Sequence, residues 1–187
     1  GLGLVERCVP FGESERSKRS IYRVKDPAFL FWYRFVAPYV TAIEGGLGER
    51  LASRLLGSDA RFEYEGHLYE RVCRQWVLRQ ARCGALPLEP TSVGSWWGTD
   101  LLARAQTDID LVAADNIDGK ILLGECRWRN DVDETDATQT LLDRQRLIPG
   151  YGQRWSYLFT KKHVSDVTAH KFANRPDVAF VCAQDLY

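Results

Sequence analysis

The fold of this chain of 187 residues is decided by the stretch TDIDLVAADNIDGKILLGECRW, residues 107–128. Two runs rich in aliphatic residues, 107–113 and 120–128, flank the sequence Asn116-Ile117-Asp118-Gly119. Apolar runs on both sides of a short segment of Asn, Asp and Gly are typical of a β-hairpin. We therefore expect two neighbouring antiparallel strands joined by a turn.

The length of this turn decides which residues of the hairpin lie opposite each other. With a four-residue turn, Asp110 lies opposite Glu125 and Asp108 lies opposite Arg127. Because strand side chains alternate between the two faces of a sheet, all four would then project from one face. With a two-residue turn, Asp110 would instead oppose Arg127 and form a surface ion pair of little energetic consequence. The sequence leaves both registers open.

The first register would place two carboxylates side by side. Directly opposed like charges destabilise a sheet by up to about 1 kcal/mol, so folding alone does not explain Asp110 opposite Glu125. A bound Mg²⁺ or Mn²⁺ ion would explain it, because such ions take carboxylate ligands and keep positions for water and phosphate oxygens. Asp108 would be a further ligand. An ion of this kind activates water and neutralises charge at phosphorus, so this register indicates phosphodiester hydrolysis.

The rest of the chain adds helices and strands around this hairpin. Asp26-Pro27 has the form of an N-cap followed by a first-turn proline, and Pro38 should kink or end the helix that begins there. Apolar residues at three- and four-residue spacing predict a long helix over 62–82. We expect further helices over 49–56, 135–147 and 164–173, and strands over 2–11, 20–24, 93–97, 155–160 and 178–183. This order predicts an α/β fold, a three-layer sandwich with a mixed central sheet, preceded by a hairpin and helices.

Composition limits how the chain could bind a partner. Lys plus Arg and Asp plus Glu number 25 each, which excludes the binding of nucleic acid through bulk positive charge alone. Residues 1–25 nevertheless carry a net charge of +3, and residues 100–136 carry a net charge of −6. The acidic segment includes the hairpin, which agrees with a site for a hard cation.

The cysteines and histidines show no metal-binding spacing along the chain. Five scattered cysteines without a C-x-x-C pair indicate free thiols in a reducing cytoplasm. His67, His163 and His170 stand at no ligand spacing from a cysteine or from one another. No apolar run approaches the roughly 20 residues of a membrane span, and no segment has the form of a secretion signal, so we expect a cytoplasmic protein.

The acidic hairpin is similar to the core of the PD-(D/E)xK nuclease superfamily. Asp110 matches the first metal-binding aspartate of that pattern, Glu125 the second acidic ligand, and Arg127 the position of the catalytic lysine. Glu70, in the segment GHLYE, matches the glutamate that the pattern places on a preceding helix. The resemblance implies a restriction-endonuclease-like fold and Mg²⁺-dependent cleavage of DNA. Arg127 would act there through its charge, because arginine does not give up its proton.

Essentially the whole chain also resembles the C-terminal domain of a family of archaeal and bacterial AAA-type ATPases. The resemblance rests on the segments GLVER, IYRVKDP, FWYRFV and ECRW, which begin at residues 3, 21, 31 and 125. It implies that residues 1–25 are the wing hairpin of a winged-helix domain, 26–60 a helical connector and 61–187 the nuclease-like domain. The chain lacks a Gly-x-x-x-x-Gly-Lys-Ser/Thr phosphate loop and begins without Met. We therefore expect the ATPase and the rest of the winged-helix domain in a preceding part of a longer protein.

Basic and aromatic residues supply candidate DNA contacts. The basic candidates at the tip of the expected wing and after the expected strand 155–160 are Arg16, Lys18, Arg19, Lys161 and Lys162. Phosphate contacts and plain solvent exposure are both compatible with these positions. The aromatic run over 29–36 could stack on bases, although aromatic residues around a helix favour buried packing.

Three functions therefore remain open. The first is a metal-dependent nuclease in which Asp110 and Glu125 bind the metal and Arg127 stabilises the phosphate. The second is a catalytically silent nuclease fold that regulates its ATPase or docks it on DNA. The third is an interaction domain with an ion-paired hairpin.

Overall fold

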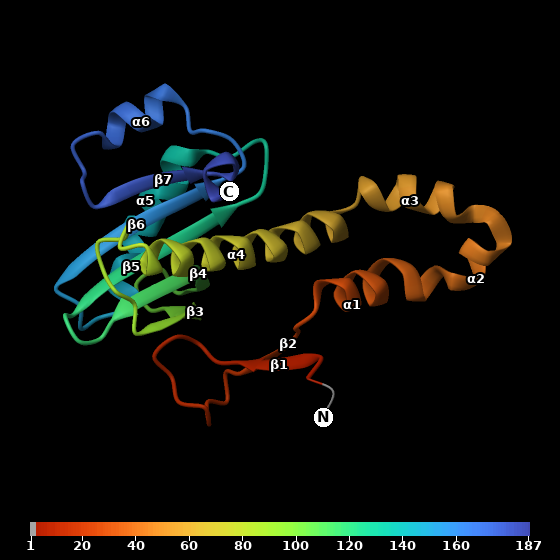
Figure 1. The fold of residues 1–187 in the computed structure, drawn as a ribbon, viewed down its shortest axis with the longest axis horizontal. Helices are drawn as coiled ribbons and strands as arrows, with labels where there is room; N and C mark the ends of the chain where they lie inside the picture. Colours follow the sequence, from red (N-terminus) through yellow and green to blue (C-terminus); the bar gives the residue numbers. More distant parts are fainter. Residues whose placement is uncertain (1–2) are drawn as a thin grey trace. The chain divides into compact units, whose positions relative to one another are not determined.

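The computed structural model describes residues 3–187 and shows a mixed α/β chain (Figure 1). The chain divides into two compact units, Gly1–Leu68 and Tyr69–Tyr187. The first unit contains a two-stranded hairpin and helices, and the second contains a five-stranded sheet with the helices that pack on it. Leu2, where we expected the first strand to begin, lies outside the described residues. The expected domain boundaries at residues 25 and 60 stay predictions.

A hairpin and a capped helix open the first unit. β1 (Val5–Cys8) and β2 (Ile21–Val24) pair antiparallel. α1 (Pro27–Phe31) follows, and Oδ1 of Asp26 accepts hydrogen bonds from the N–H groups of Ala28 and Phe29 at 2.7 and 3.3 Å. These bonds satisfy two N–H groups that have no partner within the helix, so the predicted N-cap is confirmed.

Pro38 changes the type of helix rather than ending it. α1 continues into a π-helical segment, Trp32–Val36, and then into a 3₁₀ segment, Ala37–Tyr39. The N–H of Ala37 donates to the carbonyl of Trp32, five residues back, because the proline ring that follows crowds the ordinary helical turn. This region is completed by α2 (Val40–Ala42), a second π-helical segment (Ile43–Leu47) and α3 (Gly48–Leu56).

α4 (Asp59–Arg82) has 24 residues and confirms the long helix predicted over 62–82. Tyr69, Cys73 and Val77 recur every four residues and are buried. This spacing places them on one side of the helix, so its second half packs on the sheet through that side. No helix within residues 3–187 combines the length and the apolar character that a membrane crossing requires.

The second unit is built on a mixed sheet in the order β3-β4-β5-β6-β7. The strands are β3 (Ser92–Asp100), β4 (Ala105–Asp115), β5 (Lys120–Arg127), β6 (Gln153–Thr160) and β7 (Val178–Cys182). β3, β4 and β5 form antiparallel pairs. β5, β6 and β7 run parallel and are joined through α5 (Glu134–Arg144) and α6 (Asp166–Phe172). The carboxyl ends of these three strands therefore meet at one edge of the sheet.

Helices cover both faces of this sheet. On one face, Leu111, Leu122 and Phe159 form a buried core with the apolar side of α4. On the other face α5 packs against β5 and β6, where Gln145, directly after α5, hydrogen-bonds Ser156 at 2.9 Å. Figure 1 shows α4 and α5 on opposite sides of the strands. The predicted three-layer α/β sandwich with a mixed central sheet is confirmed.

The register of the central hairpin follows the longer of the two turns considered. β4 and β5 pair from Leu111 opposite Gly124 to Asp115 opposite Lys120, which leaves residues 116–119 as the turn. Oδ1 of Asp115 accepts hydrogen bonds from the N–H groups of Ile117 and Asp118 in this turn, and Gly119 closes it with a φ of 67°. The two-residue turn, which would have opposed Asp110 to Arg127, is wrong.

Candidate functional site

An acidic cluster lies where the pairing of β4 with β5 ends. The last paired residues are Leu111 and Gly124, and Asp110 and Glu125 come next on their strands. Oδ2 of Asp110 accepts a hydrogen bond from the N–H of Cys126 at 2.8 Å. The Asp110 carboxylate thus accepts a hydrogen bond from the β5 backbone at the point where the pairing of the two strands ends.

Burial and nearby negative charges raise the pKa values of the two carboxyl groups. Burial is the largest cause for Asp110, followed by the charges of Glu125 and Glu70, and together they hold its pKa well above the ordinary value. Burial likewise raises the pKa of Glu125, whose residue is 4% exposed. The negative charge of Glu70 in α4 raises the pKa values of both groups, so Glu70 lies near the cluster.

Two arginines partly compensate Glu125. Arg127 forms an ion pair with Oε1 of Glu125, and Nη1 of Arg144 donates to Oε2 at 3.2 Å. Arg144 also donates to the carbonyl of Asp108 at 3.0 Å. It stands in the last turn of α5, 19 residues after Glu125, and no spacing in the sequence pointed to it. Only the packing of α5 on the sheet brings it to the cluster.

The charges of the cluster do not balance. The cluster contains four acids, Glu70, Asp108, Asp110 and Glu125, and the two arginines that pair with Glu125, so full ionisation leaves a formal charge of −2. Oxygen donors with this residual charge fit Mg²⁺ or Mn²⁺. Asp108 is exposed and does not join Asp110 and Glu125 in a set of three ligand atoms within 4.8 Å, as far as the described residues go. Asp110 and Glu125, which follow the last paired residues of β4 and β5, stay the candidate donors for a divalent ion.

The predicted DNA contacts lie in different units of the chain. Lys161, after β6, places its Nζ 5.0 Å from the centre of the Trp128 ring, and Lys162 is exposed. The end of β6 pairs with the end of β5, Thr160 opposite Arg127, so these lysines belong to the same sheet edge as the acidic cluster. Arg16, Lys18 and Arg19 are exposed between β1 and β2 in the first unit, where Arg19 forms an ion pair with Glu13.

A second group of possible metal ligands was missed by the sequence patterns. His163, Cys182 and Asp185 place one ligand atom each within 4.8 Å of one another. His163 and Cys182 are 19 residues apart, which is no recognised ligand spacing. The parallel pairing of β6 with β7 brings the two segments together. The sequence patterns predicted both strands but not that they pair with each other.

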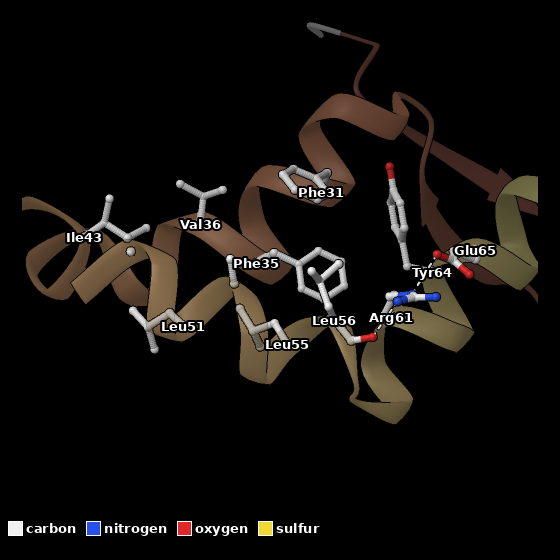
Figure 2. A pocket seen from close by; sticks show the side chains of 12 residues that line it. Phe31, Phe35, Val36, Ile43, Leu51, Leu55, Leu56, Arg61, Tyr64 and Glu65 are labelled. Atoms are coloured by element: carbon white, nitrogen blue, oxygen red, sulfur yellow. Dashed lines mark hydrogen bonds and ion pairs between the residues drawn. The ribbon is translucent and has the colours of Figure 1, made fainter. Parts of the chain in front are cut away.

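The first unit contains an apolar cavity of about 400 Å³ between its helices. Figure 2 shows Phe31, Phe35 and Tyr64 at one end of it, where the rings of Phe35 and Tyr64 meet edge to face at 5.5 Å. The charged residues of the lining, Arg61 and Glu65, pair with each other at 2.8 Å. Phe35 is buried as aromatic packing predicted, but several aromatic neighbours over 29–36 are exposed. The cavity offers apolar surface, and its charged groups are committed to each other.

Comparison with known proteins finds similarity in sequence to an archaeal protein and similarity in fold to a bacterial one. The uncharacterized protein MJECL04 of Methanocaldococcus jannaschii is 28% identical over 142 residues, which are 76% of this chain and 30% of that protein. The crystal structure of protein VC1899 from Vibrio cholerae is similar in fold, with a TM-score of 0.50 and 16% identity, over 70% of this chain and 33% of that one. The chain spans about a third of the length of these two relatives.

A family match covers the helical region and the acidic hairpin. It runs over residues 32–140, which is more than half of the chain. The match includes Glu70, Asp110, Glu125 and Arg127 but stops before Arg144. The chain belongs to the DUF234 family, archaeal and bacterial proteins of unknown function.

Proposed function

We propose that the second unit is a metal-dependent nuclease domain that hydrolyses DNA phosphodiester bonds. The observation that carries the proposal is the pair of neighbouring carboxylates, Asp110 and Glu125, with pKa values raised by burial at the end of two paired strands. Strongly perturbed acidic groups of this kind concentrate at functional sites. The order of Glu70, Asp110, Glu125 and Arg127 along the chain, similar to the PD-(D/E)xK pattern, supports the same function.

Asp110 and Glu125 would hold Mg²⁺ or Mn²⁺ through carboxylate oxygens. The ion, when bound, supplies Lewis-acid activation of the phosphate and a water of lowered pKa. Arg127 and Arg144 would stabilise negative charge on the phosphate, since guanidinium groups bind phosphate oxygens through paired N–H donors. Glu70 would orient the attacking water by accepting its hydrogen bond.

The proposed substrate is DNA, held through its phosphates. Lys161 and Lys162 would contact the backbone beside the cleavage site, and the loop with Arg16, Lys18 and Arg19 would add contacts from the wing. We further infer that the domain is the C-terminal part of a larger cytoplasmic ATPase with a winged helix. The chain matches about a third of the length of each of its two relatives, so both relatives are long enough to contain further domains.

A second candidate is a catalytically silent nuclease fold that docks its ATPase on DNA. The observation that favours it is the engagement of both Glu125 oxygens by arginines. Two guanidinium groups on one carboxylate already supply the positive charge that a metal ion would bring. Arg127 also stands where the related pattern has a lysine, and arginine does not act as a base.

A cleavage assay with matched variants decides between the two. We expect the chain to nick plasmid DNA with Mg²⁺ or Mn²⁺ and not with EDTA, and Asp110→Asn and Glu125→Gln to abolish nicking. Asp118→Asn is the control, because Asp118 is an exposed acid of the same hairpin that pairs with Lys120. DNA binding without cleavage, in this chain and in the longer protein with ATP, would establish the silent domain instead. If neither binding nor cleavage occurs, both proposals fail.

A further inference from the structure

We propose that His163, Cys182 and Asp185 form a second metal site, specific for Zn²⁺ and separate from the acidic cluster. The three ligand atoms lie within 4.8 Å of one another. Cys182 is the last residue of β7, His163 follows β6 by three residues, and Asp185 belongs to the 3₁₀ turn Ala183–Leu186. The site therefore joins three segments at the carboxyl ends of two neighbouring strands.

The frame of this site is fixed by the sheet. Cys182 pairs with Thr160, so the ends of β6 and β7 are held in register. The Cys182 residue is buried, 3% exposed, whereas His163 and Asp185 are exposed. One ligand is thus anchored in the strand, and two lie at the surface, where their side chains can rotate onto an ion. The exposed side leaves a fourth position for water or an external ligand.

The distances agree with tetrahedral zinc. Sγ of Cys182 and Nε2 of His163 are 3.5 Å apart. Bonds of about 2.3 Å to sulfur and about 2.0 Å to nitrogen at a tetrahedral angle would place these two atoms roughly 3.5 Å apart. The other distances among the three ligand atoms are at most 4.8 Å, and rotation of the exposed side chains of His163 and Asp185 would shorten them to bonding geometry around one ion.

Asp185 makes a hydrogen bond within the fold that leaves acceptor positions of its carboxylate available for a metal. Its Oδ2 accepts a hydrogen bond from the N–H of Cys182 at 2.8 Å, which caps the 3₁₀ turn and orients the carboxylate toward the thiol. A carboxylate has two oxygens and about four acceptor positions, so one capping bond does not exhaust it.

The chemistry of the donors selects the metal. One thiolate, one imidazole and one carboxylate form a mixed set that suits Zn²⁺, whereas Mg²⁺ prefers oxygen ligands alone. The acidic cluster offers oxygen donors alone, so the two sites would take different ions. Zn²⁺ would tie the loop after β6 to the end of β7, two strands from Arg127 in the same sheet.

The test measures metal binding and is independent of DNA cleavage. The reduced, metal-free chain is titrated with Zn²⁺ against a chromophoric chelator and with Co²⁺, whose thiolate complexes absorb in the near ultraviolet. We expect one Zn²⁺ per chain and a Co²⁺–thiolate band. Asp185→Asn keeps an oxygen that can cap the 3₁₀ turn, and we expect it to weaken Zn²⁺ binding by at least about tenfold.

Three variants separate this site from other thiols and acids. Cys182→Ser should lose the Co²⁺ band, whereas Cys83→Ser, which removes an exposed cysteine elsewhere, should keep it. Asp110→Asn should bind Zn²⁺ as the wild type does, even though it destroys the proposed nuclease site. The proposal is overturned if the folded wild-type chain binds no Zn²⁺ more tightly than Cys182→Ser does, in which case the three side chains form only a hydrogen-bonded cap.

Discussion

Asp110 illustrates how a single side chain can be unfavourable for folding and useful for binding. Its pKa is raised by burial and by the charges of Glu125 and Glu70. Between the pKa of the unfolded chain and that of the folded chain, the folded chain therefore keeps a proton on Asp110 that the unfolded chain has lost. The free energy of unfolding therefore falls as the pH rises from about 4 through the folded-state pKa of Asp110. A cation at the cluster would reverse this penalty.

Replacement of Asp110 should show the penalty directly. Asp110→Asn keeps an oxygen for the N–H of Cys126 and removes the charge, so we expect its free energy of unfolding without divalent metal at neutral pH to rise by on the order of 1 kcal/mol. Millimolar Mg²⁺ should raise the Tm of the wild type and leave that of Asp110→Asn unchanged. Thermal unfolding of both proteins, with and without Mg²⁺, measures this. An equal metal effect on both would exclude Asp110 as a ligand.

Asp100 shows the opposite behaviour. A hydrogen bond from the Arg146 guanidinium, 2.9 Å from Oδ1, is the main cause that lowers the pKa of Asp100 to about 2. The folded state thus releases a proton that the unfolded state keeps below pH 4, and this contribution to stability is lost as the pH falls from about 4 to about 2. We expect Asp100→Asn, followed by urea unfolding, to show a weaker loss of stability over that range than the wild type. Parallel curves would contradict the assignment.

At the scale of single elements, the strand β5 can carry the candidate site because its two faces differ in chemistry. Glu125 and Arg127 project from the face covered by α5, while Leu122 projects from the opposite face and packs in the core under α4. Gly124 lies directly opposite Leu111, the last paired residue of β4, and precedes Glu125 on β5. A Cβ atom at Gly124 would lie 3.0 Å from Cβ of Leu111 and 3.1 Å from the ring of Phe159. The strand accepts only a glycine there without displacement of the core.

Gly124→Ala should therefore destabilise the fold. We expect a loss of about 1–3 kcal/mol, because overpacking forces shifts in the backbone or in the Phe159 side chain. Gly152→Ala is the matched control, since a Cβ atom there would meet nothing within 4 Å. Chemical denaturation of the two variants measures the difference. Similar stabilities would show that β5 can yield at this point.

At the scale of the second unit, the acidic cluster depends on all three layers. α4 contributes Glu70, the sheet contributes Asp110, Glu125 and Arg127, and α5 contributes Arg144. Arg144 is the link between α5 and the sheet, because one guanidinium group binds both Glu125 and the carbonyl of Asp108. Without it, Glu125 would keep a single ion pair in a buried position.

Loss of Arg144 should cost more than an ordinary surface arginine. We expect Arg144→Ala to lower the free energy of unfolding by about 1–3 kcal/mol, since a buried carboxylate loses a charged donor. The cost should shrink in a Glu125→Gln background, where no charge is left to compensate. A double-mutant cycle from urea unfolding measures this coupling. Additive effects would show that the two side chains do not stabilise each other.

Local chemistry allowed much of the fold to be predicted from the sequence. Asp26 next to Pro27 predicted an N-cap, the alternation around 107–128 predicted a hairpin, and four-residue spacing predicted α4. These features depend on neighbours along the chain, whose geometry the backbone fixes. The sequence therefore determined which elements form, while the length of the turn, and with it the pairing of the acids, stayed open.

The tertiary structure decided what the local sequence could not express. The register that places Asp110 next to Glu125 is seen only in the folded hairpin, because the two alignments differ by two residues and bury Leu111 and Leu122 on the same face in either case. The approach of Arg144 to Glu125 and of His163 to Cys182 depends on how α5 and β7 pack against the sheet. Burial and electrostatic interactions depend on which residues are close in space. The separation of two residues along the chain does not reveal this.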